Sequence, residues 1–312
     1  MLVVNNNTSA FNTWTNFSTN MISLKKSMGN LSTGVKSVVD DASGVAISER
    51  LRAQARNASM ARNNVDNAIS FTQTADSWLQ KINDVLSRMS ELAIGANDDT
   101  KNAQDKLNIQ NEFSNLQDEI SRITSRSTAA AKYNGLYLFR GGNGVAVTTG
   151  DSVESGSVNV QVGFDGNQSL NIQLSDLQET NTEVIGTVAT YNYNSSNIVT
   201  ASTRTSVQWG SIIDTIKMSS TSTNVIGKLS LAIDHVANER ATIGSQQSRL
   251  QQTRSGLLAY EDNIRAAESK IRDIDMARES ALFARSQILT QIGNAMLAQA
   301  NQIPSQALQL IG

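Results

Sequence analysis

The sequence has no cysteine, a single proline and a single histidine among its 312 residues. The absence of cysteine excludes disulfides, thiolate nucleophiles and iron–sulfur clusters. One histidine, His235, is too few for a histidine-based metal site or a Ser-His-Asp triad. Aromatic residues make up only 5% of the chain, while Ser, Thr, Asn, Gln and Ala are abundant. This balance favours long helices over a compact globule.

The charges show no excess of either sign. There are 26 basic and 28 acidic residues, and no basic block that would bind nucleic acid or an anionic membrane surface. No window approaches the roughly 18 consecutive apolar residues of a membrane span, so we expect no membrane insertion. The first residues lack the pattern of a cleaved secretory signal. Any export is therefore expected to use a route without one.

A heptad pattern extends from Ile47 to Ala96, and its seam is interrupted by polar residues only at Gln54 and Thr72. It predicts one continuous coiled-coil helix of about 75 Å at 1.5 Å per residue. Gly95 and the polar run 97–100 supply the stop and turn that end it. A second, shorter helix follows, with apolar residues at the same spacing: Ile109, Phe113, Leu116, Ile120 and Ile123.

The other half of the chain has the same period. Residues seven apart form one apolar row: Leu229, Val236, Ile243, Leu250, Leu257, Ile264 and Ile271. Such a row needs a partner helix, and the segment 47–96 is long enough to supply it. Since the chain has to return between the two halves, we predict an antiparallel bundle and a mainly α fold.

The two extreme ends repeat this arrangement on a smaller scale. Near the N-terminus large residues alternate by three and four as an a/d seam: Trp14, Phe17, Met21, Leu24, Met28 and Leu31. The C-terminal segment around 288–300 is apolar nearly all round, and one partner helix cannot cover it. We therefore expect other copies of the chain to bury it. The residues expected to carry self-assembly are Trp14, Phe17, Met21, Leu24, Ile288, Leu289, Ile292 and Met296.

The middle of the chain changes to a period of two. Apolar residues alternate over 158–164 and again over 170–174, separated by the turn 165–167, which predicts a β-hairpin. The Ser/Thr/Asn-rich stretch 180–211 has no firm period and is expected to be irregular surface structure. The predicted organisation has three parts: 1–44 with 272–312 as an inner terminal-helix layer, 45–140 with 215–271 as a coiled-coil layer, and 141–214 as the hairpin and variable region.

Motifs that carry chemistry are scarce. The acid pairs Asp40-Asp41 and Asp98-Asp99 are expected to be helix caps and turns rather than metal ligands. The glycines of 141–144 fit no phosphate-binding pattern and are expected to connect helix and sheet. Asn-X-Ser/Thr triplets such as those at Asn16 and Asn30 fall on segments expected to be buried helix, and without a secretory signal we interpret them as chance matches. We predict no catalytic, cofactor-binding or metal-binding residue, and leave open whether 180–223 carries O-linked sugars.

The stretch Asp40–Gln54, preceded by Leu31-Ser32-Thr33-Gly34, is similar to the N-terminal segment of bacterial flagellins. Ile271–Ala277, Gln287–Leu289 and Ala298–Pro304 are similar to its C-terminal motifs, and Tyr133-Asn134-Gly135 to its transition from helix to sheet. The likeness covers about 1–140 and 220–312.

The resemblance implies a subunit of the flagellar filament, a homopolymer used for swimming, in which terminal helices form an inner layer and the coiled coil an outer one. It also implies secretion to the cell exterior, an export chaperone that binds the C-terminal region, and a cap protein at the growing tip. The family's junction protein between hook and filament, of similar length, is the alternative. A secreted enzyme on the same scaffold would need catalytic residues, yet 140–220 has neither His nor Cys. A non-polymerising coiled-coil adhesin is the remaining hypothesis.

The segment 86–93 also resembles the part of many flagellins that engages the vertebrate Toll-like receptor for flagellin. Carried over by position, the contacts implied are Leu86, Arg88, Leu92 and Glu112. Leu86 lies on the predicted seam, so a core role remains open for it. Ser90 stands where a second Arg is frequent in the family.

Overall fold

The computed structural model describes residues 7–39, 41–125, 128–139, 157–178, 184–193, 199–214 and 222–311. The glycines of 141–144 and Asp40 lie outside these ranges. The helices are α1 (Thr8–Thr33), α2 (Ala42–Ala96), α3 (Ala103–Thr124), α4 (Trp209–Asp214), α5 (Ser222–Arg272) and α6 (Met276–Ile311). The strands are β1 (Lys132–Tyr133), β2 (Leu136–Tyr137), β3 (Ser157–Gln161), β4 (Ser169–Gln173), β5 (Val184–Tyr193) and β6 (Val199–Gln208).

The chain divides into two compact units. One contains 1–56 and 260–312, and the other contains 57–259. The first unit thus brings together the two ends of the chain, which are far apart in the sequence. The mainly helical fold with small antiparallel sheets in the middle of the chain confirms the predicted fold class.

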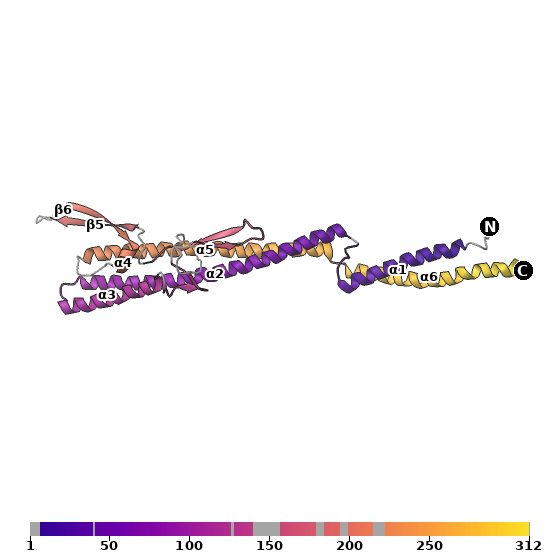
Figure 1. Ribbon diagram of the computed structural model, residues 1–312, viewed down its shortest axis with the longest axis horizontal. Coiled ribbons are helices and arrows are strands. Elements are labelled where there is room, and N and C mark those ends of the chain that lie inside the picture. Colours follow the sequence, from indigo (N-terminus) through magenta and orange to yellow (C-terminus); the bar gives the residue numbers. More distant parts are fainter. Residues whose placement is uncertain are drawn as a thin grey trace. The chain divides into compact units, whose positions relative to one another are not determined.

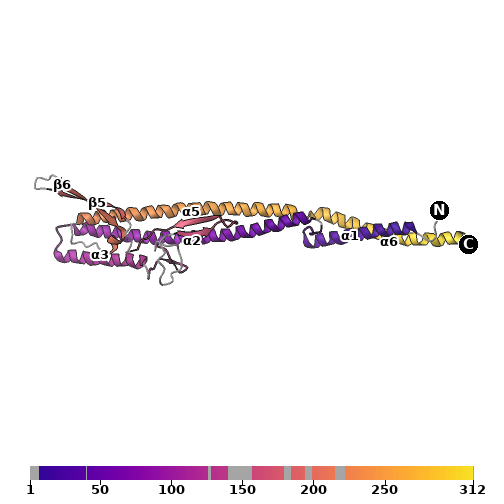
Figure 2. The same cartoon turned by 45° about the horizontal axis from the view of Figure 1, so that its top comes forward.

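In the 57–259 unit, α2 lies between α3 and α5 (Figures 1 and 2). Two ion pairs set the direction of α5 against α2: Arg254 Nε lies 2.6 Å from Asp66 Oδ1, and Arg240 Nε lies 2.8 Å from Asp76 Oδ1. The residue number rises along α2 as it falls along α5, so the two helices run antiparallel. This confirms the prediction drawn from the two heptad rows.

The predicted seam of α2 forms the core of this unit. From Ala58 to Ala96 its members are all buried, and Thr72 is accommodated because its hydroxyl donates to the carbonyl of Ile69 at 2.9 Å. Facing residues of α3 and α5 are also buried: Phe113, Ile120, Ile123, Leu229, Val236, Ile243 and Leu250. Small Ala side chains at the seam let the helices approach closely, which explains why few aromatics are needed.

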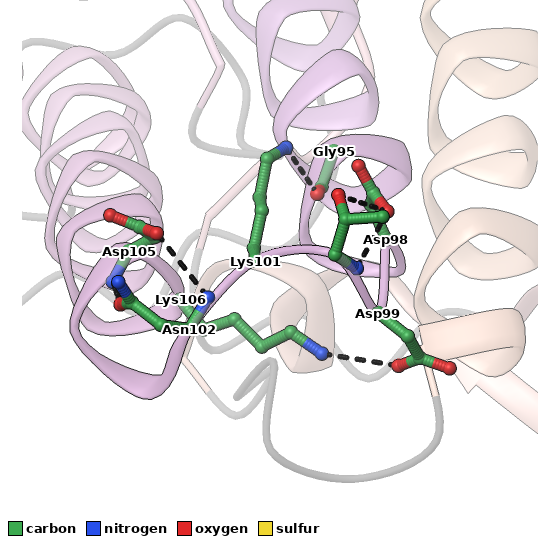
Figure 3. Close-up of polar contacts among 8 residues, drawn as sticks. Gly95, Asp98, Asp99, Lys101, Asn102, Asp105 and Lys106 are labelled. Atoms are coloured by element: carbon green, nitrogen blue, oxygen red, sulfur yellow. Dashed lines mark hydrogen bonds and ion pairs between the residues drawn. The ribbon is translucent and has the colours of Figure 1, made fainter.

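The turn between α2 and α3 follows the predicted stop signals (Figure 3). Asp98 accepts from the backbone N–H of Thr100 at 2.9 Å, and Lys101 Nζ donates to the Gly95 carbonyl at 2.6 Å. Asn102 and Asp105 form a reciprocal capping box at the start of α3. Asp41 similarly caps α2, accepting from the N–H of Gly44 at 2.7 Å. Asp41 and Asp98 therefore serve as cap and turn residues, as predicted.

The short hairpin β1–β2 turns on two residues with positive φ, Asn134 at 47° and Gly135 at 81°. A two-residue type I′ turn requires positive φ at both central residues, because its twist then matches the twist of the two paired strands. Asn-Gly is the pair of residues that adopts these φ values most readily. Its neighbour Tyr133 packs edge-on against Phe71 of α2, with ring centroids 5.6 Å apart. The turn thereby holds the chain against α2 where helix gives way to sheet.

The predicted hairpin over 158–174 is present as β3–β4. Val158 pairs with Ile172 and Val160 with Leu170, and β4 alternates strictly between exposed and buried side chains. Helix side chains cap its backbone: Asn64 donates to the carbonyl of Gln161 at 3.2 Å and Gln246 to that of Gln173 at 3.4 Å. The sheet is thus fixed against α2 and α5.

The expectation of irregular structure over 180–211 is wrong. Residues 184–193 and 199–208 form a further antiparallel pair of strands, β5–β6, with register shifts near each end. Its base rests on α5, where Gly186 approaches Leu231 and Val188 approaches Gly227. Thr and Val favour extended backbone, which explains why strands form here. The sequence shows no alternating apolar pattern because a two-stranded ribbon has little face to bury.

Helix α4, which follows β6, adds buried residues to the core of the 57–259 unit. Trp209 is fully buried, donates its indole N–H to the Leu177 carbonyl at 2.7 Å, and packs against His235 with ring centroids 5.7 Å apart. Gln117 of α3 donates to the Ile212 carbonyl at 2.9 Å. His235 is therefore a packing residue.

We expect Ile82→Ala to destabilise the 57–259 unit. Ile82 is fully buried on α2, and removing its side chain leaves a cavity that costs about 2–5 kcal/mol. Thermal unfolding followed by circular dichroism should show a clear fall in midpoint. Met60→Ala on the same helix is the control, because Met60 is 62% exposed and its loss should change the midpoint little. Equal effects of the two substitutions would contradict this packing.

Candidate assembly surface

In the unit of 1–56 and 260–312, α1 and α6 pack along each other in opposite directions. Asn7 donates to the carbonyl of Ala300 at 2.8 Å, and Asn30 donates to Glu279 at 3.3 Å. Midway between them, Phe17 crosses Gly293 so closely that a Cβ there would lie 3.1 Å from its ring. Gly293 therefore permits the close approach of the two helices.

The contact between them is a two-helix coiled-coil seam. On each helix, residues that are buried or half-buried recur at alternating steps of three and four, which is the a/d spacing. On α6 they are Glu279, Phe283, Ser286, Thr290, Gly293, Leu297 and Ala300. On α1 the residues at this spacing are Ala10, Thr13, Phe17, Asn20, Leu24, Ser27 and Leu31, and Ser18, Met21 and Asn30 are half-buried or buried beside them. Many are small or polar, so this seam buries little apolar surface.

A second apolar row lies beside the seam of α6 and is open. Leu282, Leu289, Met296 and Ile303 are seven residues apart and are 42%, 36%, 53% and 41% exposed. Two more apolar residues on the same outward side, Ile288 and Ile292, are 56% and 52% exposed. The C-terminal residues predicted to carry self-assembly therefore face away from α1.

The N-terminal helix also has outward apolar residues. Trp14 and Met28 are 55% and 56% exposed, so their predicted place in the seam is wrong. Phe17 and Leu24 face α6, while Met21 is half-buried at its edge. On α1, the row with Phe17 and Leu24 lies beside the row with Trp14 and Met28, and α6 covers only the first row. Phe11 and Ile22, each 67% exposed, extend the open surface.

The two linkers of this unit are joined to each other. Val35 and Asp273 form an antiparallel bridge, with Lys36 N–H donating to the Arg272 carbonyl at 2.8 Å. Lys36 Nζ also donates to the carbonyl of Ile271 at 2.9 Å. Arg272, whose side chain is only 19% exposed, makes an ion pair with Glu49 on the first turns of α2. We call these contacts the linker clamp; they tie the ends of α1 and α5 to the start of α2.

Two regions of the chain match known protein families. The bacterial flagellin N-terminal helical region matches residues 4–144, and the bacterial flagellin C-terminal helical region matches residues 226–311. Together the matches include α1, α2, α3, α5 and α6, which are the helices of the seam, the clamp and the coiled coil. The chain belongs to the bacterial flagellin family.

Individual flagellins are similar over the full length. The flagellar filament 33 kDa core protein of Treponema phagedenis is 33% identical over 99% of this chain and 100% of its own length. Flagellin of Bacillus subtilis is 34% identical over 99% of each chain. The crystal structure of Bacillus cereus flagellin covers 62% of this chain and 88% of its own at 22% identity and a TM-score of 0.43.

These findings confirm the prediction of a flagellar filament subunit, and nothing in them favours the junction protein. Flagellins are a structural family rather than an enzyme family. In the described ranges, no group of three or more His, Asp or Glu side chains is placed to hold a metal ion. Those ranges also contain no helix long and apolar enough to cross a membrane.

The segment that resembles a receptor-binding part of flagellins has two kinds of residue. Leu86 is fully buried and Leu92 is 8% exposed, so both lie in the coiled-coil core. Arg88 is exposed and donates to Glu112 of α3 at 2.7 Å and to Glu91 at 3.0 Å. These hydrogen bonds raise the pKa of the Arg88 guanidinium, Glu112 having the largest effect. Of the four residues carried over by position, Arg88 and Glu112 are the two that present polar groups to solvent.

We expect acid to loosen the linker clamp of this flagellin. The hydrogen bond from Arg272 holds the pKa of Glu49 below its ordinary value, and the charges of Arg272, Arg52 and Arg56 act in the same direction. At pH values between the lowered and the ordinary pKa of Glu49, the folded state therefore binds fewer protons than the unfolded state. The ion pair stabilises the folded state fully above the ordinary pKa, and this stabilisation is lost as the pH falls through the lowered pKa.

Two linker amides report on the clamp: that of Lys36, and that of Ile274, which donates to the Gly34 carbonyl at 3.2 Å. Glu49→Gln should speed hydrogen exchange at both amides at about pH 7, and should differ little from the unaltered chain in strong acid. Exchange measured by mass spectrometry checks this. Glu119→Gln is the matched control, since the pKa of Glu119 is also lowered by a bonded arginine, Arg122, but on α3. A change of linker exchange in that control, or none in Glu49→Gln, would contradict the clamp.

Proposed function

We propose that this flagellin polymerises through the open apolar rows of α1 and α6, with residues 1–44 and 272–312 forming the inner layer of the filament. The coiled coil of 45–140 and 215–271 then forms the next layer, and 141–214 the variable surface. The observation that supports this is the open row Leu282, Leu289, Met296 and Ile303, whose seven-residue spacing suits a further helix.

The energetics favour assembly by copies of the chain. Fully burying a large apolar side chain contributes about 1.5–3 kcal/mol, so each half-exposed member of the rows gains about 1 kcal/mol when a neighbour covers it. Trp14, Met28 and the row on α6 repeat in every copy, so the gain recurs at each contact. A helix pair that leaves this much apolar surface in water is incomplete until neighbours arrive.

The subunit acts outside the cell in this proposal. It is exported, an export chaperone covers the apolar C-terminal region before assembly, and a cap protein guides its addition at the filament tip. In this proposal the chaperone covers the open row on α6, because chains with exposed apolar rows tend to aggregate. The chain performs no catalysis.

Leu289→Asp tests the assembly surface. It places a carboxylate in the open row, and burying an unpaired charge between copies costs several kcal/mol. We expect the purified variant to stay monomeric at concentrations where the unaltered chain forms filaments, as seen by electron microscopy and sedimentation. Its helicity should be unchanged, because Leu289 is exposed and lies outside the seam positions of α6.

Gln291→Asp is the matched control for this test. It adds the same charge two residues away on α6, at an exposed polar position outside the open row. Filaments should form normally from it. Normal filaments from Leu289→Asp would contradict the proposed surface, and loss of helicity in that variant would show that Leu289 supports the monomer instead.

We also propose that Arg88 and Glu112 form the contact for the vertebrate receptor, with Leu86 and Leu92 supporting them from the core. A bonded, exposed guanidinium held by two carboxylates is a preorganised anchor for an interface. Neighbouring subunits would cover the same surface in the filament. The monomer is therefore the form recognised.

Arg88→Ala should weaken receptor activation by the monomer about tenfold or more, the range of an interface anchor. A cell reporter assay over a range of monomer concentrations measures this. Arg122→Ala is the control, since Arg122 is an equally exposed arginine paired with Glu119 on α3. Equal activation by the unaltered chain and Arg88→Ala would remove Arg88 from the contact.

A further inference from the structure

The turn of the β3–β4 hairpin has a fixed backbone. Gln168 N–H donates to the Asp165 carbonyl at 3.1 Å, which is the bond that closes a four-residue β-turn. Val162 N–H donates to the Gln168 carbonyl at 3.0 Å and extends the hairpin to the turn. Gln161 Nε2 donates to the carbonyls of Gly163 and Asp165 from inside. Gly166 and Asn167 therefore stand at the apex of a well-supported loop.

This apex carries the acceptor triplet for N-linked sugar, Asn167-Gln168-Ser169. All three residues are exposed. Ser169 begins the alternation of β4, with its side chain on the solvent side and Leu170 buried behind it. In the described part of the chain, the side-chain amide of Asn167 has no hydrogen-bond partner. No hydrogen bond there has to break before the amide can enter a transferase.

The same triplet occurs elsewhere in unsuitable places. Asn30 is 6% exposed and donates to Glu279, while Asn7 caps α1 and donates to Ala300. Asn16 and Asn57 are exposed but lie within helices, where residues two apart point to different sides. A transferase must reach the asparagine amide and the hydroxyl two residues later from one side. Among the described triplets, the one at Asn167 lies outside any helix, in a turn that leads into β4, with both the asparagine and the serine exposed.

We propose that Asn167 is an N-glycosylation site of this chain. The donor is a hexose joined through its anomeric carbon to a diphosphate. In the transfer, a bond forms between Asn167 Nδ2 and the anomeric carbon, and the bond from that carbon to the diphosphate oxygen breaks. The amide gives up one proton to a base of the transferase, and the diphosphate ester leaves with the bonding pair. Neither side is oxidised or reduced.

Mass spectrometry of filaments sheared from the cells that make this flagellin tests the proposal. The peptide containing Asn167 should carry at least one hexose, and fragmentation that preserves the sugar should locate it on Asn167. An unmodified peptide, or sugar located on a Ser or Thr instead, would overturn the proposal.

Two substitutions of the hydroxyl residue separate recognition from folding. Ser169→Ala should abolish the modification although Asn167 remains, and Ser169→Thr should keep it. Asn57→Gln should leave it unchanged. Retention of the sugar in Ser169→Ala would show that the triplet is not what is recognised, and circular dichroism checks that each variant is folded.

The donor is identified by incubating the purified chain with the soluble or the membrane fraction of the same cells. Transfer from a nucleoside-diphosphate hexose in the soluble fraction assigns a nucleotide donor, and transfer confined to membranes assigns a polyprenyl-diphosphate donor. Transfer in neither fraction would contradict the proposal.

Discussion

Helix α6 carries more apolar surface than one partner helix can cover, and the behaviour of the terminal unit follows from that excess. Its seam against α1 uses small and polar residues such as Gly293 and Ser286, while Leu289 and Met296 lie in an adjacent open row. In a chain meant to stand alone the large residues would occupy the seam. In the proposed assembly, their placement in the open row leaves the larger hydrophobic gain for contacts between copies.

The 57–259 unit has the opposite design. Its apolar seam is buried within the chain from Ala58 onward, with α3, α5 and the β3–β4 hairpin covering α2. The linker clamp belongs to the terminal unit and joins its linkers at Lys36 and Arg272. One chain thus combines a bundle whose seam is buried within the unit with terminal helices whose apolar rows stay open.

Sequence periodicity predicted the long helices, their antiparallel direction and the β3–β4 hairpin, because each buries a row of apolar residues at a fixed spacing. It failed where two apolar rows lie side by side: Trp14 and Phe17 are equally suited to a seam, and only the packing of α1 on α6 shows that Phe17 faces inward. It failed for β5–β6 because a ribbon with little buried face leaves no alternating pattern. Whether Leu86 is buried could not be predicted for a related reason. The spacing shows on which face of α2 Leu86 lies, but not whether another element packs on that face.

The most direct measurement of the central claim is hydrogen exchange on the same chain as dilute monomer and as filament. If neighbours complete the terminal unit, the amides of α1 and α6 exchange quickly in the monomer and become strongly protected in the filament. The amides of α2 between Val65 and Ala93 should be protected in both states, which makes them the internal reference. Equal protection of α1 and α6 before and after assembly would contradict the account.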